Sequence, residues 1–151
     1  MSTDARRVQV FNRQEKRLFP DELLSSLEGW GDRVMGLLGS RYPARVKLPG
    51  LVSVSLIDDS EMQRVHTQFM DNPDPTDVIT FPYGEEGEIL ISVETATRKA
   101  AELEVSFERE ITLYLVHGLL HLAGYEDATQ EARMEMEGLQ ESLLNELLGS
   151  L

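Results

Sequence analysis

The sequence contains no cysteine. This absence excludes disulfide bonds, cysteine nucleophiles and zinc sites built from thiolates, and it is typical of proteins in a reducing compartment. Long apolar runs are also missing, because the longest uncharged stretch covers only residues 111–125, whereas a bilayer requires roughly 18 to 20 residues. The first residues, MSTDARRVQV, show no apolar segment of the kind that secretory signals carry. We therefore expect a cytoplasmic protein without a membrane partner.

Positive charge is scarce. The chain has 14 Lys and Arg against 27 Asp and Glu, which gives a net charge of −13. An acidic chain repels phosphate backbones, so composition alone does not suggest a nucleic-acid partner. DNA is not expected to be a partner. The cations are concentrated in residues 1–48, where they either solvate one face or form a local basic patch. They are Arg6, Arg7, Arg13, Lys16, Arg17, Arg41, Arg45 and Lys47, together with Arg33.

The pattern of apolar residues predicts an α+β fold. Residues 7–13, 51–57, 78–81 and 88–93 are predicted as strands, and residues 21–38, 60–70, 94–103, 107–123 and 129–148 as helices. The order β-α-β-α-β-β-α-α-α indicates a small mixed four-stranded sheet with about five helices packed on it. Residues 71–76, rich in proline and aspartate, are predicted as a loop. The length of 151 residues, without repeats or linkers, predicts a single domain over residues 1–151.

Two histidines on one predicted helix suggest a metal site. His117 and His121 are four residues apart, so both imidazoles project from one helical face within reach of one ion. Gly124 allows the chain to reverse directly after the helix, which brings the carboxylate of Asp127 back toward the imidazoles. Two histidines and one carboxylate leave coordination positions open, as catalytic zinc sites do.

Other roles are open for some of these residues. Asp127 also suits the N-cap of the last helix, because Gln130 three residues later would complete a capping box. The helix that carries His117 and His121 is apolar all round, so we expect both rings to be partly buried and to need polar partners. His66 lies on a short charged helix, where a solvated side chain is expected.

Three sequence blocks resemble one known family. Residues 117–125 read H-G-L-L-H-L-A-G-Y, residues 75–82 read P-T-D-V-I-T-F-P, and residues 87–92 read G-E-I-L-I-S. In order and spacing, these blocks resemble the signatures of the YbeY family of bacterial metallo-endoribonucleases that mature ribosomal RNA. The resemblance covers about residues 50–148, and the predicted order of elements is that of the family.

The resemblance implies a function. It suggests a metal-dependent endoribonuclease acting in ribosomal RNA maturation and ribosome quality control, with water activated by one bound divalent ion, expected to be Zn²⁺. The implied partner is ribosomal RNA or its precursor, and the acidic charge of the chain, which opposes unaided RNA binding, suggests a ribosomal protein as a second partner. RNA contact is predicted at Arg41, Arg45 and Lys47, next to the loop at residues 71–76, because the rest of the chain is too acidic.

Two positions depart from the family pattern. The family has a third histidine as zinc ligand where this chain has Asp127, which adds negative charge and favours harder metals. The family also carries an arginine, thought to engage RNA phosphate, at the position that Met70 occupies here. Arg64, six residues earlier, is the candidate replacement. Loss of this cation would remove a clamp on transition-state charge.

Two other functions compete with the nuclease. Proteases with similar ligand spacing need a glutamate after the first histidine as general base, and this chain has Gly118 there, with Glu126 as the candidate substitute base. The other alternative is a non-catalytic, ribosome-associated factor whose ion holds the last two helices together. Removal of a structural ion should unfold the protein, whereas removal of a catalytic ion should mainly abolish activity.

Overall fold

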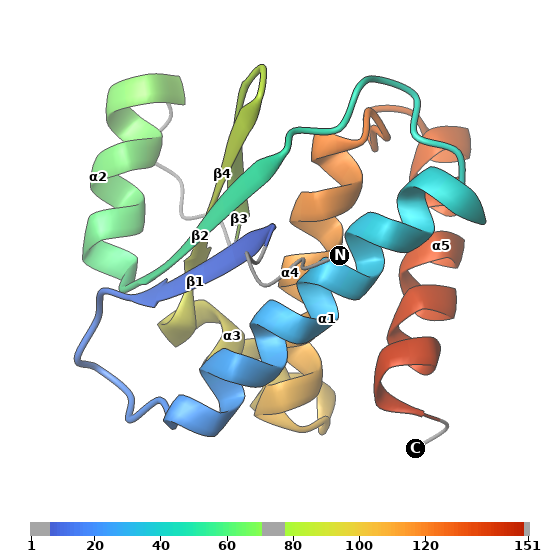
Figure 1. Cartoon of the computed structure of the whole chain (residues 1–151). Coiled ribbons are helices and arrows are strands. Elements are labelled where there is room, and N and C mark those ends of the chain that lie inside the picture. The colour runs from blue at the N-terminus through green and yellow to red at the C-terminus, as the bar shows by residue number, and fades with distance from the viewer. Residues whose placement is uncertain (1–6, 71–77, 150–151) are drawn as a thin grey trace, which may run out of the picture.

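The fold is built on one mixed β-sheet with helices on both of its faces (Figure 1). The structure is a computed structural model that describes residues 7–70 and 78–149, without the side chains of residues 69 and 70. The strands are β1 (Val8–Asn12), β2 (Leu51–Ile57), β3 (Val78–Tyr83) and β4 (Glu86–Ser92). The helices are α1 (Asp21–Ser40), α2 (Asp59–Met70), α3 (Val93–Leu103), α4 (Phe107–Leu122) and α5 (Gln130–Leu148).

The sheet has the strand order β1-β2-β4-β3. β1 is parallel to β2, and β2 is parallel to β4. β3 pairs antiparallel with β4 and forms one edge, so the sheet is mixed. The α+β class, the mixed four-stranded sheet and the predicted order of elements are therefore confirmed.

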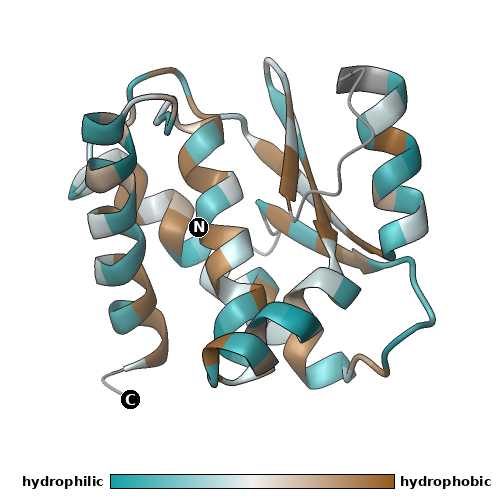
Figure 2. Cartoon of the chain, turned by 180° about the vertical axis from the view of Figure 1, so that it is seen from behind, coloured by the Kyte–Doolittle hydropathy of each residue, from teal (hydrophilic) through white to brown (hydrophobic). Residues whose placement is uncertain are grey.

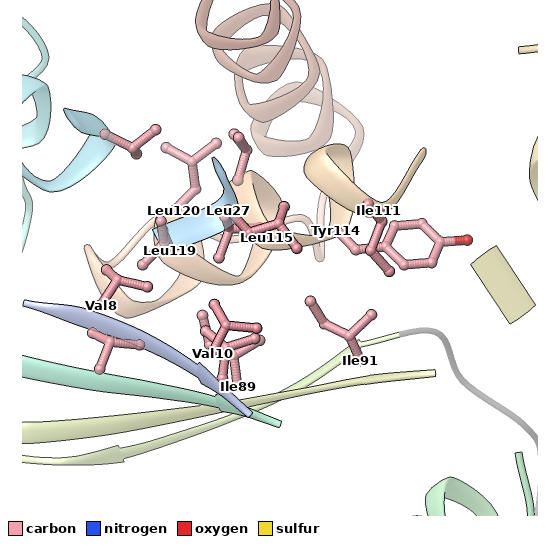
Figure 3. Packing of buried hydrophobic residues seen from close by; sticks show 14 of the residues in the cluster. Val8, Val10, Leu27, Ile89, Ile91, Ile111, Tyr114, Leu115, Leu119 and Leu120 are labelled. Carbon is pink, nitrogen blue, oxygen red and sulfur yellow. The ribbon is translucent and has the colours of Figure 1, made fainter. Parts of the chain in front are cut away.

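The main core lies between the sheet and α1, α4 and α5 (Figure 1). Alternation along the strands directs every second side chain toward these helices. Figure 3 shows Val8, Val10, Ile89 and Ile91 of the sheet facing Leu115 and Leu119 of α4, and all six are buried. α4 is buried on most of its surface, as its apolar sequence predicts.

The opposite face of the sheet is only partly covered. α2 packs there over a smaller cluster of Ile57, Met62, Val65, Ile79 and Leu90. In Figure 2 the strands are largely hydrophobic, whereas α2 and α5 show broad hydrophilic stretches. In the part of the chain that the structure describes, no helix is both long and apolar enough to cross a membrane.

Several predicted boundaries differ from the observed ones by one or two residues, and two of these differences have a clear local cause. Val93 is the first residue of α3 and not the last of a strand, because the Ser92 side chain accepts a hydrogen bond from the backbone N–H of Thr95 and so begins the helix. The β3–β4 hairpin is also tighter than predicted. Tyr83 pairs with Glu86, which leaves only Gly84 and Glu85 in the turn, and Gly84 has a φ of +76°.

Candidate metal centre

α4 carries both histidines of the predicted metal site. Its first turn begins at Ser106, whose side chain accepts a hydrogen bond from the backbone N–H of Arg109. Most of the helix is buried, but the side chains of His117 and His121 are 28% and 26% exposed. The predicted partial burial of both rings is confirmed, and it leaves their outer edges open to solvent.

The three predicted ligands come together in space. Nε2 of His117 lies 3.0 Å from Nε2 of His121, and Oδ2 of Asp127 lies 3.8 Å from each of these nitrogens. One potential ligand atom from each residue falls within 4.8 Å of the other two. The arrangement is a small triangle of two nitrogens and one oxygen, with about half of Asp127 exposed. These donor types suit Zn²⁺ and related divalent ions.

The other nitrogen of each ring faces an oxygen. Nδ1 of His117 is hydrogen-bonded to the side-chain Oε1 of Gln140, and Nδ1 of His121 lies 3.0 Å from the backbone carbonyl oxygen of Tyr125. Both oxygens accept hydrogen bonds, so each Nδ1 must carry the hydrogen. Both Nε2 atoms then direct lone pairs at each other across 3.0 Å, which is unfavourable unless a cation lies near them. The geometry therefore fits a divalent ion.

The environment of His121 favours its neutral form. Burial lowers the pKa of His121 below its ordinary value, and the neighbouring His117 lowers this pKa further. Asp127, the Tyr125 carbonyl and Glu126 act in the opposite direction but do not outweigh burial. A neutral imidazole is the form that binds metal ions.

The turn after α4 is fixed by a distant segment of the chain. Gly124 has a φ of +98°, and a side chain there would approach Cβ of Arg45 to 3.0 Å. The backbone N–H groups of Arg45 and Val46 donate to the carbonyl of Ala123, and the Tyr125 hydroxyl donates to the carbonyl of Pro43 at 2.7 Å. The Arg45 guanidinium also stacks on the Tyr125 ring. These contacts hold in place the Tyr125 carbonyl that orients His121.

Asp127 is not the cap of the last helix, so that alternative was wrong. α5 begins at Gln130, and its N-cap is Thr129, whose side chain accepts a hydrogen bond from the backbone N–H of Ala132 at 3.0 Å. Thr129 satisfies the free N–H group of Ala132, whereas a cap at Asp127 would bind the N–H group of Gln130. The carboxylate of Asp127 is therefore available to the histidines.

Two glycines bring α4 close to the sheet. A Cβ atom on Gly118 would lie 2.9 Å from side-chain atoms of Ile89, and a Cβ atom on Gly87 would lie 2.9 Å from Leu122. Each glycine thus makes room for a bulky residue of the opposite element. The space next to Gly118 is filled by the core, so the position at which a protease has its general base cannot hold a glutamate facing the site.

We expect Gly118→Ala to lower the free energy of unfolding by about 1–3 kcal/mol, because the new methyl group would displace Ile89 in a packed core. Gly138→Ala in α5 is the matched control. No atom lies within 4 Å of its added Cβ, so this change should be neutral or should stabilise the protein by up to about 1 kcal/mol. Chemical denaturation of both variants would measure the difference. Equal stability of the two variants would contradict the tight contact.

The other predicted residues are less closely tied to the cluster. Glu126 is exposed. The three cations predicted to contact RNA are each ion-paired: Arg41 with Glu146, Arg45 with Glu135 at 2.6 Å, and Lys47 with Glu85 at 2.8 Å. Their role in RNA binding stays a prediction. The loop at residues 71–76 and the side chain of Met70 lie outside the described residues.

Arg64, the candidate replacement for the family arginine, is also engaged. Its guanidinium contacts Glu61 at 2.5 Å and the side chain of Gln68 at 3.0 Å. His66, predicted as solvated, is half-buried on the same helix and has partners of its own. It does not belong to the cluster of His117, His121 and Asp127.

Gln140 is the functional residue that sequence reasoning missed. It is a buried polar residue on α5, between the buried Met136 and Leu143. A polar side chain within the apolar face of an amphipathic helix was a signal that could have found it, because a buried amide needs a partner. The partner is His117, 23 positions earlier in the chain.

Comparison with known proteins identifies one family. A family model described as Endoribonuclease YbeY matches residues 9–148. Proteins named Endoribonuclease YbeY from Allorhizobium ampelinum and Aquifex aeolicus are 32% and 33% identical to the chain. The first match covers 83% of both chains, and the second covers 83% of this chain and 84% of the relative.

A relative from Streptomyces coelicolor with the same name is 35% identical and covers 70% of this chain and 76% of its own length. Among solved structures, the solution structure of TM1509 from Thermotoga maritima is similar, with a TM-score of 0.65 and 26% identity. That match covers 94% of this chain and 89% of the other.

Proposed function

This chain belongs to the endoribonuclease YbeY family. On that premise, we propose that it is a metal-dependent hydrolase that cleaves RNA in ribosomal RNA maturation and ribosome quality control. His117, His121 and Asp127 are the proposed ligands of one divalent ion, expected to be Zn²⁺. The observation that carries the proposal is the pair of Nε2 atoms 3.0 Å apart, with the Asp127 carboxylate 3.8 Å from both.

The residues of the site have separate tasks in this proposal. His117 and His121 hold the ion through Nε2, while Gln140 and the Tyr125 carbonyl hold the rings in the tautomer that binds. A divalent ion bound there supplies a Lewis acid for a phosphate oxygen and for water. Asp127 neutralises part of the positive charge and leaves coordination positions open for the substrate.

A proton acceptor is also needed for hydrolysis. Glu126 is the candidate, because its exposed carboxylate is adjacent to Asp127 in the chain and close enough to influence the charge of His121. This role rests on proximity and on the chemistry of a carboxylate. The proposed substrate is ribosomal RNA or its precursor. A net charge of −13 opposes unaided binding to RNA, so a basic ribosomal protein is a fitting partner in the cytoplasm.

The alternative of a purely structural ion is distinguished by chelation. The main core is a large apolar cluster in which α1 and α4 pack near the sheet and α5 packs on α4, so we expect the fold to persist without an ion. Chelator treatment should abolish cleavage of a ribosomal RNA precursor while circular dichroism and the melting profile stay close to those of the untreated protein. Addition of Zn²⁺ or Mn²⁺ should restore cleavage. Unfolding on chelation would instead favour the structural ion.

Asp127→His tests the departure from the family pattern. We expect the variant to bind Zn²⁺ more tightly relative to Mn²⁺, because imidazole suits zinc and carboxylate suits harder ions. Stability should change little, since Thr129 caps α5. Competition titrations with a chromophoric chelator would give the two affinities. Glu126→His is the matched control, and an equal shift of metal preference in both variants would exclude Asp127 as a specific ligand.

A further inference from the structure

Among the described residues, six Lys and Arg side chains form no ion pair: Arg7, Arg33 and Arg133, and three that lie close together in the sequence near the start of the chain. Arg41, Arg45, Lys47, Arg64, Arg98, Lys99 and Arg109 each form an ion pair. Arg13, Lys16 and Arg17, which we call the β1–α1 cations, have no carboxylate within 4.0 Å among residues 7–70 and 78–149. In a chain this acidic, a cluster of cations left without acidic partners is suited to an external anion.

The β1–α1 cations connect three hollows of the surface into one groove. Lys16 lines one hollow with Thr97 and Arg98 and a second with Asn12 and Asp58. Arg13 lines this second hollow and also a third on the open face of the sheet. Through these shared residues, the hollows form one groove that runs from Thr97 and Arg98 of α3, along the segment between β1 and α1, to the sheet face beside α2.

The third hollow is lined by aromatic rings. The side chains of Phe81 and Tyr83 stack with an interplanar angle of 9°, and Tyr83 is 62% exposed. Arg13 lies over the ring of Phe11 and donates to the Ser55 hydroxyl at 3.2 Å. The volume of about 310 Å³ lies at the small end of the range for ligand sites, about 300–1,000 Å³. It also has a floor of Ile57, Val65 and Leu90.

We propose that this groove binds an unpaired segment of RNA, with phosphates on the β1–α1 cations and a base against Tyr83 in the third hollow. This inference rests on the proposed function, because it names the surface that holds the substrate. Cations that follow a groove, together with exposed aromatic rings, are the combination used to bind single strands. A duplex would keep its base faces stacked inside and could not use the rings.

The acidic residues of the groove define how the strand lies. Glu61 and Glu88 line the third hollow, Glu15 and Asp58 line the second, and Glu94 lines the first. Glu61 is neutralised by Arg64 and Asp58 accepts a hydrogen bond from the backbone N–H of Glu61, whereas Glu88 faces the hollow beside Tyr83. A carboxylate at this place repels phosphate and accepts hydrogen bonds from base N–H groups. The backbone of the strand therefore follows Arg13 and Lys16, and the base points toward Glu88.

The test compares paired charge reversals in the full-length protein. Arg13→Glu/Lys16→Glu is the test variant, and Arg17 is left unchanged because its guanidinium packs 3.7 Å from the centre of the Phe107 ring. Arg33→Glu/Arg133→Glu makes the same change in charge elsewhere. Arg41→Glu/Lys47→Glu makes the same change in charge on the surface where the sequence predicted RNA contact. Fluorescence anisotropy with a short labelled single-stranded RNA would give the affinity over a range of KCl concentrations, with melting temperature and metal content checked for each variant.

We expect Arg13→Glu/Lys16→Glu to lower the affinity at least about tenfold relative to Arg33→Glu/Arg133→Glu. The plot of the logarithm of the association constant against the logarithm of the KCl concentration has a negative slope. Its magnitude should decrease by about 0.7 for each phosphate contact that the variant loses on a single strand. Tyr83→Ala should lower the affinity with little change of slope, because stacking is not electrostatic.

The proposal is overturned if the Arg13/Lys16 variant binds like the Arg33/Arg133 variant, or if only the Arg41/Lys47 variant loses affinity and slope. Equal binding of polyglutamate or of duplex RNA by the parent protein would also overturn it. Failure of the proposed function looks different: the parent protein would bind the single strand in this groove but would not cleave RNA with any divalent ion. Cleavage that persists in the Arg13/Lys16 variant with an unchanged KM would reject the groove and leave the proposed function intact.

Discussion

His121→Ala should abolish stoichiometric binding of a divalent ion. The substitution removes one of the three proposed ligands, and the two that remain, His117 and the half-exposed Asp127, form an open pair that water and buffer can displace. Loss of a residue that only orients a ligand weakens metal binding by about 10–100-fold, so loss of a ligand itself should cost more than about 100-fold. Metal analysis after gel filtration and competition with a chelator would measure the loss.

His66→Ala is the matched control, because it removes the one other histidine of the chain, which lies on α2 and outside the cluster. This control should retain one ion for each chain. The His121→Ala variant should also fold, since its side chain is partly exposed while the surrounding core of α4 is unchanged. A folded His121→Ala protein that still carries a full equivalent of metal would rule out this cluster as the metal site.

Gln140→Leu should weaken metal binding by about 10–100-fold without removing a ligand. Oε1 of Gln140 is the acceptor for Nδ1 of His117, and leucine fills a similar space but accepts no hydrogen bond. His117 would then be free to place its hydrogen on Nε2, the nitrogen that faces the ion. Calorimetric titration would measure the affinity, and the ¹⁵N chemical shifts of the imidazole would report the tautomer directly.

Two further variants isolate the role of the acceptor. Gln140→Glu retains an oxygen at the same place and should keep both the tautomer and most of the affinity. Gln130→Leu changes the other glutamine of α5, at the exposed start of the helix, and should leave the metal site unaltered. If Gln140→Leu shows the parent tautomer and the parent affinity, Gln140 is a packing residue and does not position His117.

The secondary structure could be predicted because each element carries its own local signal. α4 has a largely apolar sequence between a serine and a glycine, and the structure shows Ser106 as its N-cap and Gly124 with a positive φ after its end. The spacing of His117 and His121 likewise fixes their relative position within one helix. Errors arose where two local signals compete: Val93 suits a strand by its β-branched side chain, but the cap at Ser92 starts a helix.

The surroundings of the metal site could not be predicted in the same way. The contact between Gln140 and His117 depends on how α5 crosses α4, and the role of Arg45 depends on where the segment before β2 meets the turn after α4. Asp127 and Thr129 both suit a cap by residue type, and only the course of the backbone decides that Thr129 takes this position. Such choices arise from tertiary packing, for which a single sequence holds no local pattern.

The hydrogen bond from the Tyr125 hydroxyl to the Pro43 carbonyl joins positions that are 82 residues apart. A ribosome releases residues 43–46 long before the helix that bears the histidines, so the two segments meet only after a large loop has closed. Closure of such a loop has an entropic cost that neighbouring residues in a helix avoid. Before this loop closes, the helix alone can place the two imidazoles side by side. The Tyr125 carbonyl that orients His121 is not yet fixed at that stage. For this reason we expect selective binding of a metal ion only in the folded protein, after the N-terminal half has docked.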